Sequence, residues 1–173
     1  MTVIDLTKSL SATIDIYPGD PEVDISVVQN LSETGWEVRS LSMGSHTGTH
    51  VDAFSHAVPG GDALDHIPLH RFAGKARRIR PHGPLPHEVG LIFDHHISVQ
   101  QEAEILAARP PFIGGPGLDG DLERSLLAAG ILTFDGLTNL DALPMDTPFT
   151  FCGFPLKIAD GDGSPIRAVA LVF

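Results

Sequence analysis

Three histidines and one aspartate lie within eleven residues of the N-terminal half of the chain, at His46, His50, Asp52 and His56. Imidazole nitrogen and carboxylate oxygen are ligands that suit divalent ions such as Zn²⁺ and Mn²⁺. The intervening threonine–glycine–threonine disfavours a regular helix, because glycine and β-branched residues are poor helix formers. We therefore expect a tight loop that gathers His46, His50 and Asp52 around one metal ion, with Gly48 allowing close backbone approach.

The same segment has a simpler interpretation, as a polar loop in a chain that has nine histidines among 173 residues. The strand and turns that flank the histidine-rich segment determine its position in the fold. A strand expected over residues 38–43 leads into the loop, and turn signals stand on both sides. The segment Tyr17-Pro18-Gly19-Asp20-Pro21 predicts one turn and Pro59-Gly60-Gly61-Asp62 another, because Pro fixes φ and Gly supplies positive φ.

The rest of the chain predicts more strands than helices. Alternation of Val23, Ile25 and Val27 with polar neighbours indicates a half-buried strand. Ser98 and Gln101 form a capping box for a helix to about residue 108, and a second helix follows Asp119. We also expect a short helix over residues 66–72. Further strands are expected over residues 3–6, 76–79, 90–93, 131–134, 149–151 and 166–173. The strand over residues 166–173 is apolar on both faces, so we expect it to lie centrally in the sheet. This pattern predicts one α/β or α+β domain over residues 1–173, with a mixed or mainly antiparallel sheet.

Charge and composition exclude several classes of function. Acidic residues outnumber basic ones by 22 to 11, and the formal net charge is −11. Such a surface repels nucleic acids and anionic membranes, so we expect neither as a partner. Cys152 is the single cysteine, which excludes an intramolecular disulfide. No secretory signal and no apolar stretch of roughly 20 residues is present, and we expect a cytoplasmic protein.

The histidine-rich segment resembles the signature of the cyclase-family metal hydrolases, which include bacterial kynurenine formamidase and isatin hydrolase. That signature reads H-x-G-T-H-x-D-x-P-x-H, and Phe54 stands where the family has proline. Residues 4–7, 17–21, 65–69, 137–140 and 160–167 resemble other family segments, and the resemblance fades between about residues 84 and 116. The positions that match the signature are His46, Gly48, Thr49, His50, Asp52 and His56.

The resemblance implies a compact swivelling β/β/α fold and roles for particular residues. His46, His50 and Asp52 would hold a first metal ion, and Asp52 would also bridge to a second. His56 would act as general acid or base, and Tyr17 stands where the family often has an aromatic residue that contacts the substrate. A packed turn aromatic is the alternative for Tyr17. Family members commonly form dimers or tetramers, so we expect a homo-oligomer.

The later ligands depart from the family pattern. A histidine and a glutamate twelve residues apart complete the second site in relatives, and Glu123 and Asp135 occupy those positions here. Glu123 could instead be favoured by the dipole of a helix N-terminus, and Asp135 could be a turn residue. The chain is also shorter than typical members in the middle. His95 and His96 lie near that region, either as a replacement ligand or as surface residues that point to opposite faces.

Two enzymatic functions follow from this site. In the first, one or two zinc or manganese ions activate a water that attacks a small amide, formamide, lactam or lactone, while His56 transfers the proton. In the second, the altered ligands no longer place a nucleophilic water, and the site catalyses a cyclisation, dehydration or isomerisation in a natural-product pathway. A non-catalytic scaffold relative is the third alternative.

Overall fold

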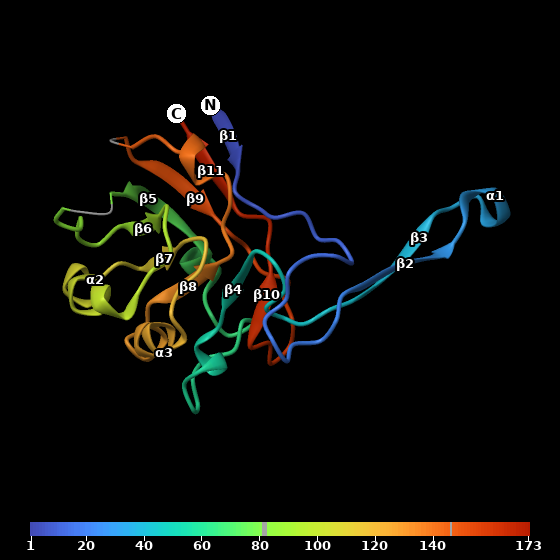
Figure 1. The fold of residues 1–173 in the computed structure, drawn as a ribbon, viewed down its shortest axis with the longest axis horizontal. Coiled ribbons are helices and arrows are strands. Elements are labelled where there is room, and N and C mark those ends of the chain that lie inside the picture. Colours follow the sequence, from blue (N-terminus) through green and yellow to red (C-terminus); the bar gives the residue numbers. More distant parts are fainter. Residues whose placement is uncertain (81–82, 146) are drawn as a thin grey trace.

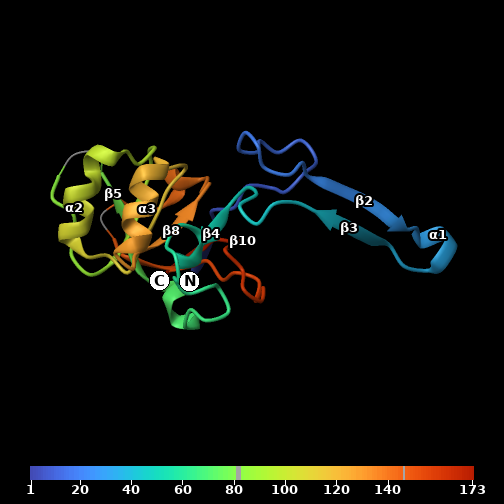
Figure 2. The same ribbon diagram turned by 90° about the horizontal axis from the view of Figure 1, so that it is seen from below.

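The computed structural model describes residues 1–80, 83–145 and 147–173. Within these residues one mixed sheet of nine strands forms the body, and a two-stranded hairpin leaves it as a long arm (Figures 1 and 2). The order across the large sheet is β1-β11-β9-β5-β6-β7-β8-β4-β10. Its strands are β1 (Thr2–Asp5), β4 (His50–Asp52), β5 (Ala73–Ile79), β6 (Gly90–Phe93), β7 (Phe112–Gly114), β8 (Leu132–Asp135), β9 (Phe149–Cys152), β10 (Gly163–Pro165) and β11 (Val169–Val172).

The centre of the sheet is parallel from β5 through β6 and β7 to β8, and helices connect β6 to β7 and β7 to β8. The connections contain η3 (Val99–Gln101), α2 (Glu102–Ala108) and α3 (Gly120–Ala128), which cover one face of the sheet (Figure 2). The capping box of Ser98 and Gln101 is present, as the sequence predicts. Among the described residues, every helix is too short or too polar to cross a bilayer. The buried residues that join helices and sheet on this face include Leu91, Phe93, Ile105, Ile113, Leu122 and Leu126.

The opposite face of the sheet buries an aromatic cluster. The ring centroids of Phe112, Phe134 and Phe151 lie 4.8–5.5 Å apart, and all three side chains are almost fully buried. Burial of one such side chain stabilises a fold by about 1.5–3 kcal/mol. Gly90 begins β6 against this cluster, where a Cβ atom would lie 2.2 Å from the Phe112 ring. Phe134 of this cluster belongs to β8, the strand that pairs with β4, so the core packs directly beside the histidine-rich segment.

The two ends of the chain lie together in the sheet. Strand β1 pairs antiparallel with β11, which in turn pairs with β9. The last strand is therefore flanked on both sides as expected, although it lies next to the sheet edge and starts only at Val169. The predicted helix over residues 66–72 is present only as the 3₁₀ turn η2 (Leu69–Phe72), because Pro68 disfavours a helical conformation of the residue before it. Two further 3₁₀ turns are η1 (Phe54–His56) and η4 (Leu140–Ala142).

The arm consists of β2 (Asp24–Gln29), the single-turn helix α1 (Leu31–Thr34) and β3 (Val38–Ser42). Its strands pair with each other and not with the large sheet. The prediction of a half-buried strand here is wrong for its outer part, since Val27 is 40% exposed and no residue of β2 is fully buried. Alternation of apolar residues showed a strand with an apolar face, but not whether this chain covers that face.

Candidate metal centre

The histidine-rich segment is held by β4, which lies between β8 and β10 near one end of the sheet (Figure 1). In the antiparallel register, His50 lies opposite Asp135 of β8, while Asp52 lies opposite Thr133 of β8 and Gly163 of β10. All three residues of β4 are buried. Strand pairing on both sides therefore fixes the backbone that presents His50 and Asp52.

The loop before β4 is fastened to the end of β8. Gly48 has a φ of +70° and Gly136 has a φ of +67°, a conformation that side chains with a Cβ rarely adopt. The two glycines also meet, because a Cβ on Gly136 would lie 2.3 Å from the Gly48 carbonyl oxygen. The Thr49 hydroxyl donates a hydrogen bond of 2.7 Å to the Gly136 carbonyl. The threonine–glycine segment thus forms the expected tight loop.

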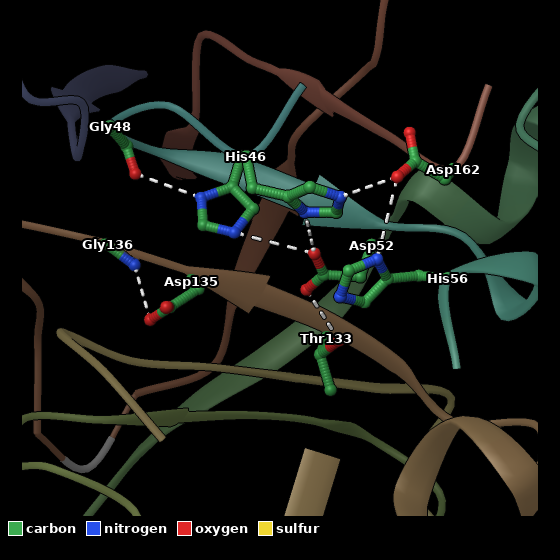
Figure 3. Close-up of polar contacts among 9 residues, drawn as sticks. His46, Gly48, Asp52, His56, Thr133, Asp135, Gly136 and Asp162 are labelled. Atoms are coloured by element: carbon green, nitrogen blue, oxygen red, sulfur yellow. Dashed lines mark hydrogen bonds and ion pairs between the residues drawn. The ribbon is translucent and has the colours of Figure 1, made fainter. Parts of the chain in front are cut away.

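Two imidazoles converge on one carboxylate oxygen (Figure 3). Asp52 Oδ1 lies 2.7 Å from His46 Nδ1 and 3.4 Å from His50 Nε2. The other oxygen, Asp52 Oδ2, accepts a hydrogen bond of 2.8 Å from the Thr133 hydroxyl. His50 Nδ1 lies 3.0 Å from the Gly48 carbonyl oxygen, which can only accept, so Nδ1 carries the proton and Nε2 is left as a ligand atom. The three predicted ligands of the first metal therefore lie together, within 4.8 Å of one another.

The carboxylates around His46 and His50 create a negative potential that favours a bound cation. Burial would raise the pKa of Asp52, whose side chain is completely buried, but the hydrogen bond from His46 and the charge of His50 hold the pKa below its usual value. Burial would likewise lower the pKa of His46, but Asp52 and Asp162 outweigh it and raise the pKa to about 9. A buried carboxylate that stays ionised between two imidazoles is a donor set that fits Zn²⁺ or Mn²⁺.

His56 lies beside this group, at the end of η1. The rings of His46 and His56 are 4.0 Å apart between centroids, at an interplanar angle of 41°. His56 Nδ1 is 3.6 Å from Asp162 Oδ2, and the same oxygen is 3.1 Å from His46 Nε2. The side chain of His56 is 35% exposed, so a small molecule can reach it. Sequence reasoning assigned no role to Asp162, although it lies in the segment of residues 160–167 that resembles the family.

The structure brings Glu123, but not Asp135, into a group of potential ligand atoms among the described residues. Glu123, in the first turn of α3, forms a group with Asp52 and His56 whose potential ligand atoms lie within 4.8 Å of one another. Burial and the negative charge of Asp52 raise the pKa of Glu123 to about 9. Asp135 Oδ1 accepts a hydrogen bond of 2.6 Å from the backbone N–H of Gly136, and among the described residues it joins no such group. Ligation of a metal by Glu123 or Asp135 stays a prediction.

The remaining candidates lie outside these groups within the described part of the chain. Tyr17 is 77% exposed in the turn before the arm. His95 pairs with Asp94 at 3.1 Å, and His96 pairs with Asp119 at 2.8 Å. The two adjacent histidines thus have separate carboxylate partners, in line with the interpretation that they are surface residues.

Comparisons with known proteins agree with this arrangement. Residues 4–106 match the family described as "Putative cyclase". A kynurenine formamidase of Salinibacter ruber is 29% identical over 205 aligned positions, which cover 98% of this chain and 97% of that protein. Because this chain has 173 residues, the alignment leaves gaps in it, as expected for a shortened member.

Two solved structures share the fold. Isatin hydrolase A of Labrenzia aggregata superposes with a TM-score of 0.82 at 22% identity, over 99% of this chain and 93% of that one. A potential metal-dependent hydrolase with cyclase activity has a TM-score of 0.78 at 20% identity, over 98% and 96% of the two chains. The likeness confirms the predicted α/β fold with its curled mixed sheet. Since the family match extends over more than half of the chain, this protein belongs to the putative cyclase family.

Proposed function

We propose that this chain is a metal-dependent hydrolase of a small amide, formamide, lactam or lactone. The observation that carries the proposal is the convergence of His46, His50 and the buried Asp52 on one point, with His56 beside it. A relative that spans nearly the whole chain is a kynurenine formamidase, and isatin hydrolases share its fold. Both names describe hydrolysis at a carbonyl carbon next to nitrogen, which places amides and lactams first among the substrates to test.

The residues of the site divide the chemistry between them. His46, His50 and Asp52 would hold the ion, and Glu123 is the best-placed further carboxylate. When bound, a divalent ion supplies Lewis acidity, which polarises a carbonyl and makes water more acidic. His56 presents Nδ1 to Asp162, and its other nitrogen points toward Asp52 (Figure 3). That nitrogen is the atom that would take a proton from the attacking water and deliver it to the leaving nitrogen.

Metal analysis followed by a substrate panel tests the proposal. The protein, purified without chelators, should retain about one or two equivalents of zinc or manganese, the two ions that suit this donor set. The loaded enzyme should then hydrolyse at least one of N-formylkynurenine, isatin and simple lactones. Less than about 0.3 equivalents after reconstitution with either ion would contradict the metal site, given that structural and catalytic sites bind their ion stoichiometrically.

One observation favours a second function that uses the same site. Asp135 occupies the position of a family metal ligand, but one of its carboxylate oxygens accepts a hydrogen bond from the backbone N–H of Gly136, and Asp135 joins no group of potential ligand atoms among the described residues. A site with fewer ligands could bind the ion without holding water for attack, and would then serve an intramolecular cyclisation or isomerisation. Full metal occupancy without turnover of any substrate in the panel would support this second function.

We also infer that residues 1–173 act as one domain within a homo-oligomer in the cytoplasm. The sheet joins the first strand to the last, which supports the single domain. The arm exposes Val28, Leu31, Trp36 and Leu41 by 56–74%, and such apolar side chains commonly mark protein interfaces. Sedimentation should therefore show a dimer or tetramer, and a double substitution of Trp36→Ser and Leu41→Ser should weaken it. A monomeric wild-type protein would contradict this inference.

A further inference from the structure

We propose that Asp162 is a positioning residue that orients the metal ligand His46 and the acid–base residue His56 through one carboxylate oxygen. The inference rests on the proposed function, since it assigns Asp162 a role toward the same ion and the same proton transfer. It concerns a residue 116 positions away from His46 in the chain. Three observations support it: the backbone that carries Asp162 is fixed, the two ring nitrogens of His46 face different carboxylates, and Asp162 contacts His56.

The backbone of Asp162 is fixed against the metal-binding strand. Its carbonyl accepts a hydrogen bond of 2.8 Å from the N–H of Ala53, which directly follows β4. The next residue, Gly163, begins β10 opposite Asp52 in the antiparallel register. Asp162 is therefore attached to the site by main-chain hydrogen bonds on both sides. Its side chain is still 49% exposed, so it is available to act on the site without being part of the core.

The ring of His46 lies between two carboxylates. Its Nδ1 faces Asp52, which is shared with His50, and its Nε2 lies 3.1 Å from Asp162 Oδ2. A histidine that binds a metal through one nitrogen usually donates the N–H of the other nitrogen to a carboxylate or carbonyl, which fixes the ring. The Nδ1 side is the ligand side, because both other ligands are there. Asp162 then occupies the position of the outer carboxylate.

A second ligand, His50, and the backbone at Gly163 support the same arrangement. His50 is held in the same manner, since its Nδ1–H donates to the Gly48 carbonyl and leaves Nε2 for the ion. The His46 ring also presses on Gly163, where a Cβ atom would lie 2.3 Å from the ring carbon Cε1. Each imidazole is thus held at the nitrogen that does not face Asp52, His50 by the Gly48 carbonyl and His46 by Asp162.

The contact with His56 extends this arrangement to proton transfer. The oxygen that contacts His46 lies 3.6 Å from His56 Nδ1. This distance is longer than a hydrogen bond but within the range of an ion pair, so Asp162 acts on His56 through its charge. An ionised Asp162 favours a proton on His56 Nδ1 and leaves the other nitrogen to accept one from water.

The three side chains could alternatively hold a cation themselves, because His46, His56 and Asp162 also have ligand atoms within 4.8 Å of one another. That arrangement would use His46 Nε2 instead of Nδ1 and would make Asp162 a direct ligand. Removal of Asp162 distinguishes these two roles, because only a direct ligand is required for an ion to be bound at all. A positioning residue changes the affinity of an ion, whereas a direct ligand is needed for its presence.

The experiment compares Asp162→Ala, Asp162→Asn and the control Asp160→Asn in the full-length protein. Asp160 lies in the same turn with a φ of +54°, a conformation that Asn tolerates, so the control removes an equal charge without touching either histidine. Zn²⁺ affinity is measured by competition with a chelator. We expect Asp162→Ala to lose about 10–100-fold in affinity with the ion count unchanged, as is typical for an outer carboxylate. Asp162→Asn should recover part of this loss because it keeps an oxygen acceptor for His46 Nε2–H, and the control should match wild type.

Kinetics at saturating metal give the second readout. Because Asp162 contacts His56, kcat of Asp162→Ala should fall at least about tenfold while KM changes little. Unchanged affinity and kcat in Asp162→Ala would overturn the inference, and so would the loss of a whole equivalent of Zn²⁺, which would make Asp162 a direct ligand. Equal defects in Asp162→Ala and Asp160→Asn would also overturn it, since they would show only an effect of charge. A wild-type protein without metal would overturn the proposed function as well, so the two failures are distinguishable.

Discussion

Replacement of Glu123 by Gln is expected to stabilise the metal-free protein at neutral pH. Glu123 faces Asp52, which stays ionised, and the two carboxyl groups share a hydrogen bond. Such a bond requires a proton on Glu123. Gln has nearly the same shape and donates from its amide without needing to bind a proton, so Glu123→Gln isolates the cost of keeping Glu123 protonated.

The size of the effect follows from the pKa. Burial and the charge of Asp52 raise the pKa of Glu123 from 4.5 to about 9. Between these values the folded chain holds a proton that the unfolded chain has released, so the free energy of unfolding falls by about 1.4 kcal/mol per pH unit. At pH 7 the accumulated cost is about 3 kcal/mol, and at pH 4 it is near zero. The stabilisation by Glu123→Gln should therefore grow with pH across this range.

Urea unfolding of the chelator-treated protein at pH 4, 5.5 and 7 measures this difference directly. Glu104→Gln is the matched control, because Glu104 is an exposed glutamate on the neighbouring helix α2. The control should change stability by less than about 0.5 kcal/mol at every pH, as surface substitutions usually do. In saturating Zn²⁺ the advantage of Gln should shrink or reverse, since ligation by Glu123 would favour its ionised form.

Two results would refute the reasoning on Glu123. A gain below about 0.5 kcal/mol at pH 7 would mean that Glu123 does not bind a proton in the folded metal-free protein. An equal gain at pH 4 and pH 7 would show that Gln improves packing and does not relieve a charge. Either result would also remove the electrostatic support for Glu123 as a further ligand near Asp52.

Three other predictions concern the histidines. His56→Ala should lower kcat by roughly 10²–10⁴-fold with the metal content unchanged, measured by steady-state kinetics and metal analysis. Gly163→Ala should weaken metal binding because its Cβ would lie 2.3 Å from the His46 ring, whereas Gly120→Ala, where nothing lies within 4 Å, should leave the chelator-competition curve unchanged. The metal-free protein should lose stability as pH rises from 6.5 to about 9, because protonated His46 has a raised pKa and stabilises the fold below that range; His46→Gln should lose less in the same urea titration.

Local signals in the sequence predicted most of the elements. The strand over residues 90–93 and the capping box of Ser98 and Gln101 are present as expected, because a short apolar run and a helix cap are both read from neighbouring residues. The exposure of the arm could not be predicted in this way. Alternating apolar residues indicate that β2 has an apolar face, and burial of that face depends on what lies next to it in space.

In the candidate site, too, features within one short segment could be predicted, and features that depend on distant segments could not. His46, His50 and Asp52 could be found from the sequence because they share one short segment, and the structure brings them together. Asp162 could not be found from the sequence, because strand pairing places it next to a segment more than a hundred residues away. The altered ligands show a third case. Alignment placed Glu123 at the position of the family histidine and Asp135 at that of the family glutamate. In the structure Glu123 joins a group of potential ligand atoms, whereas Asp135 Oδ1 accepts a hydrogen bond from the backbone N–H of Gly136.

The pairing of β4 with β8 and β10 has a consequence for when the candidate metal centre can assemble during synthesis. The ribosome releases the histidine-rich segment early, but the strands that flank β4 begin at Leu132 and Gly163. A nascent chain cannot pair β4 on both sides until the segment up to Pro165 has emerged. An ion that needs this paired strand to hold His50 and Asp52 would bind only after that segment is made, so synthesis in the presence of a chelator is expected to yield folded apoprotein that takes up the ion when it is added later.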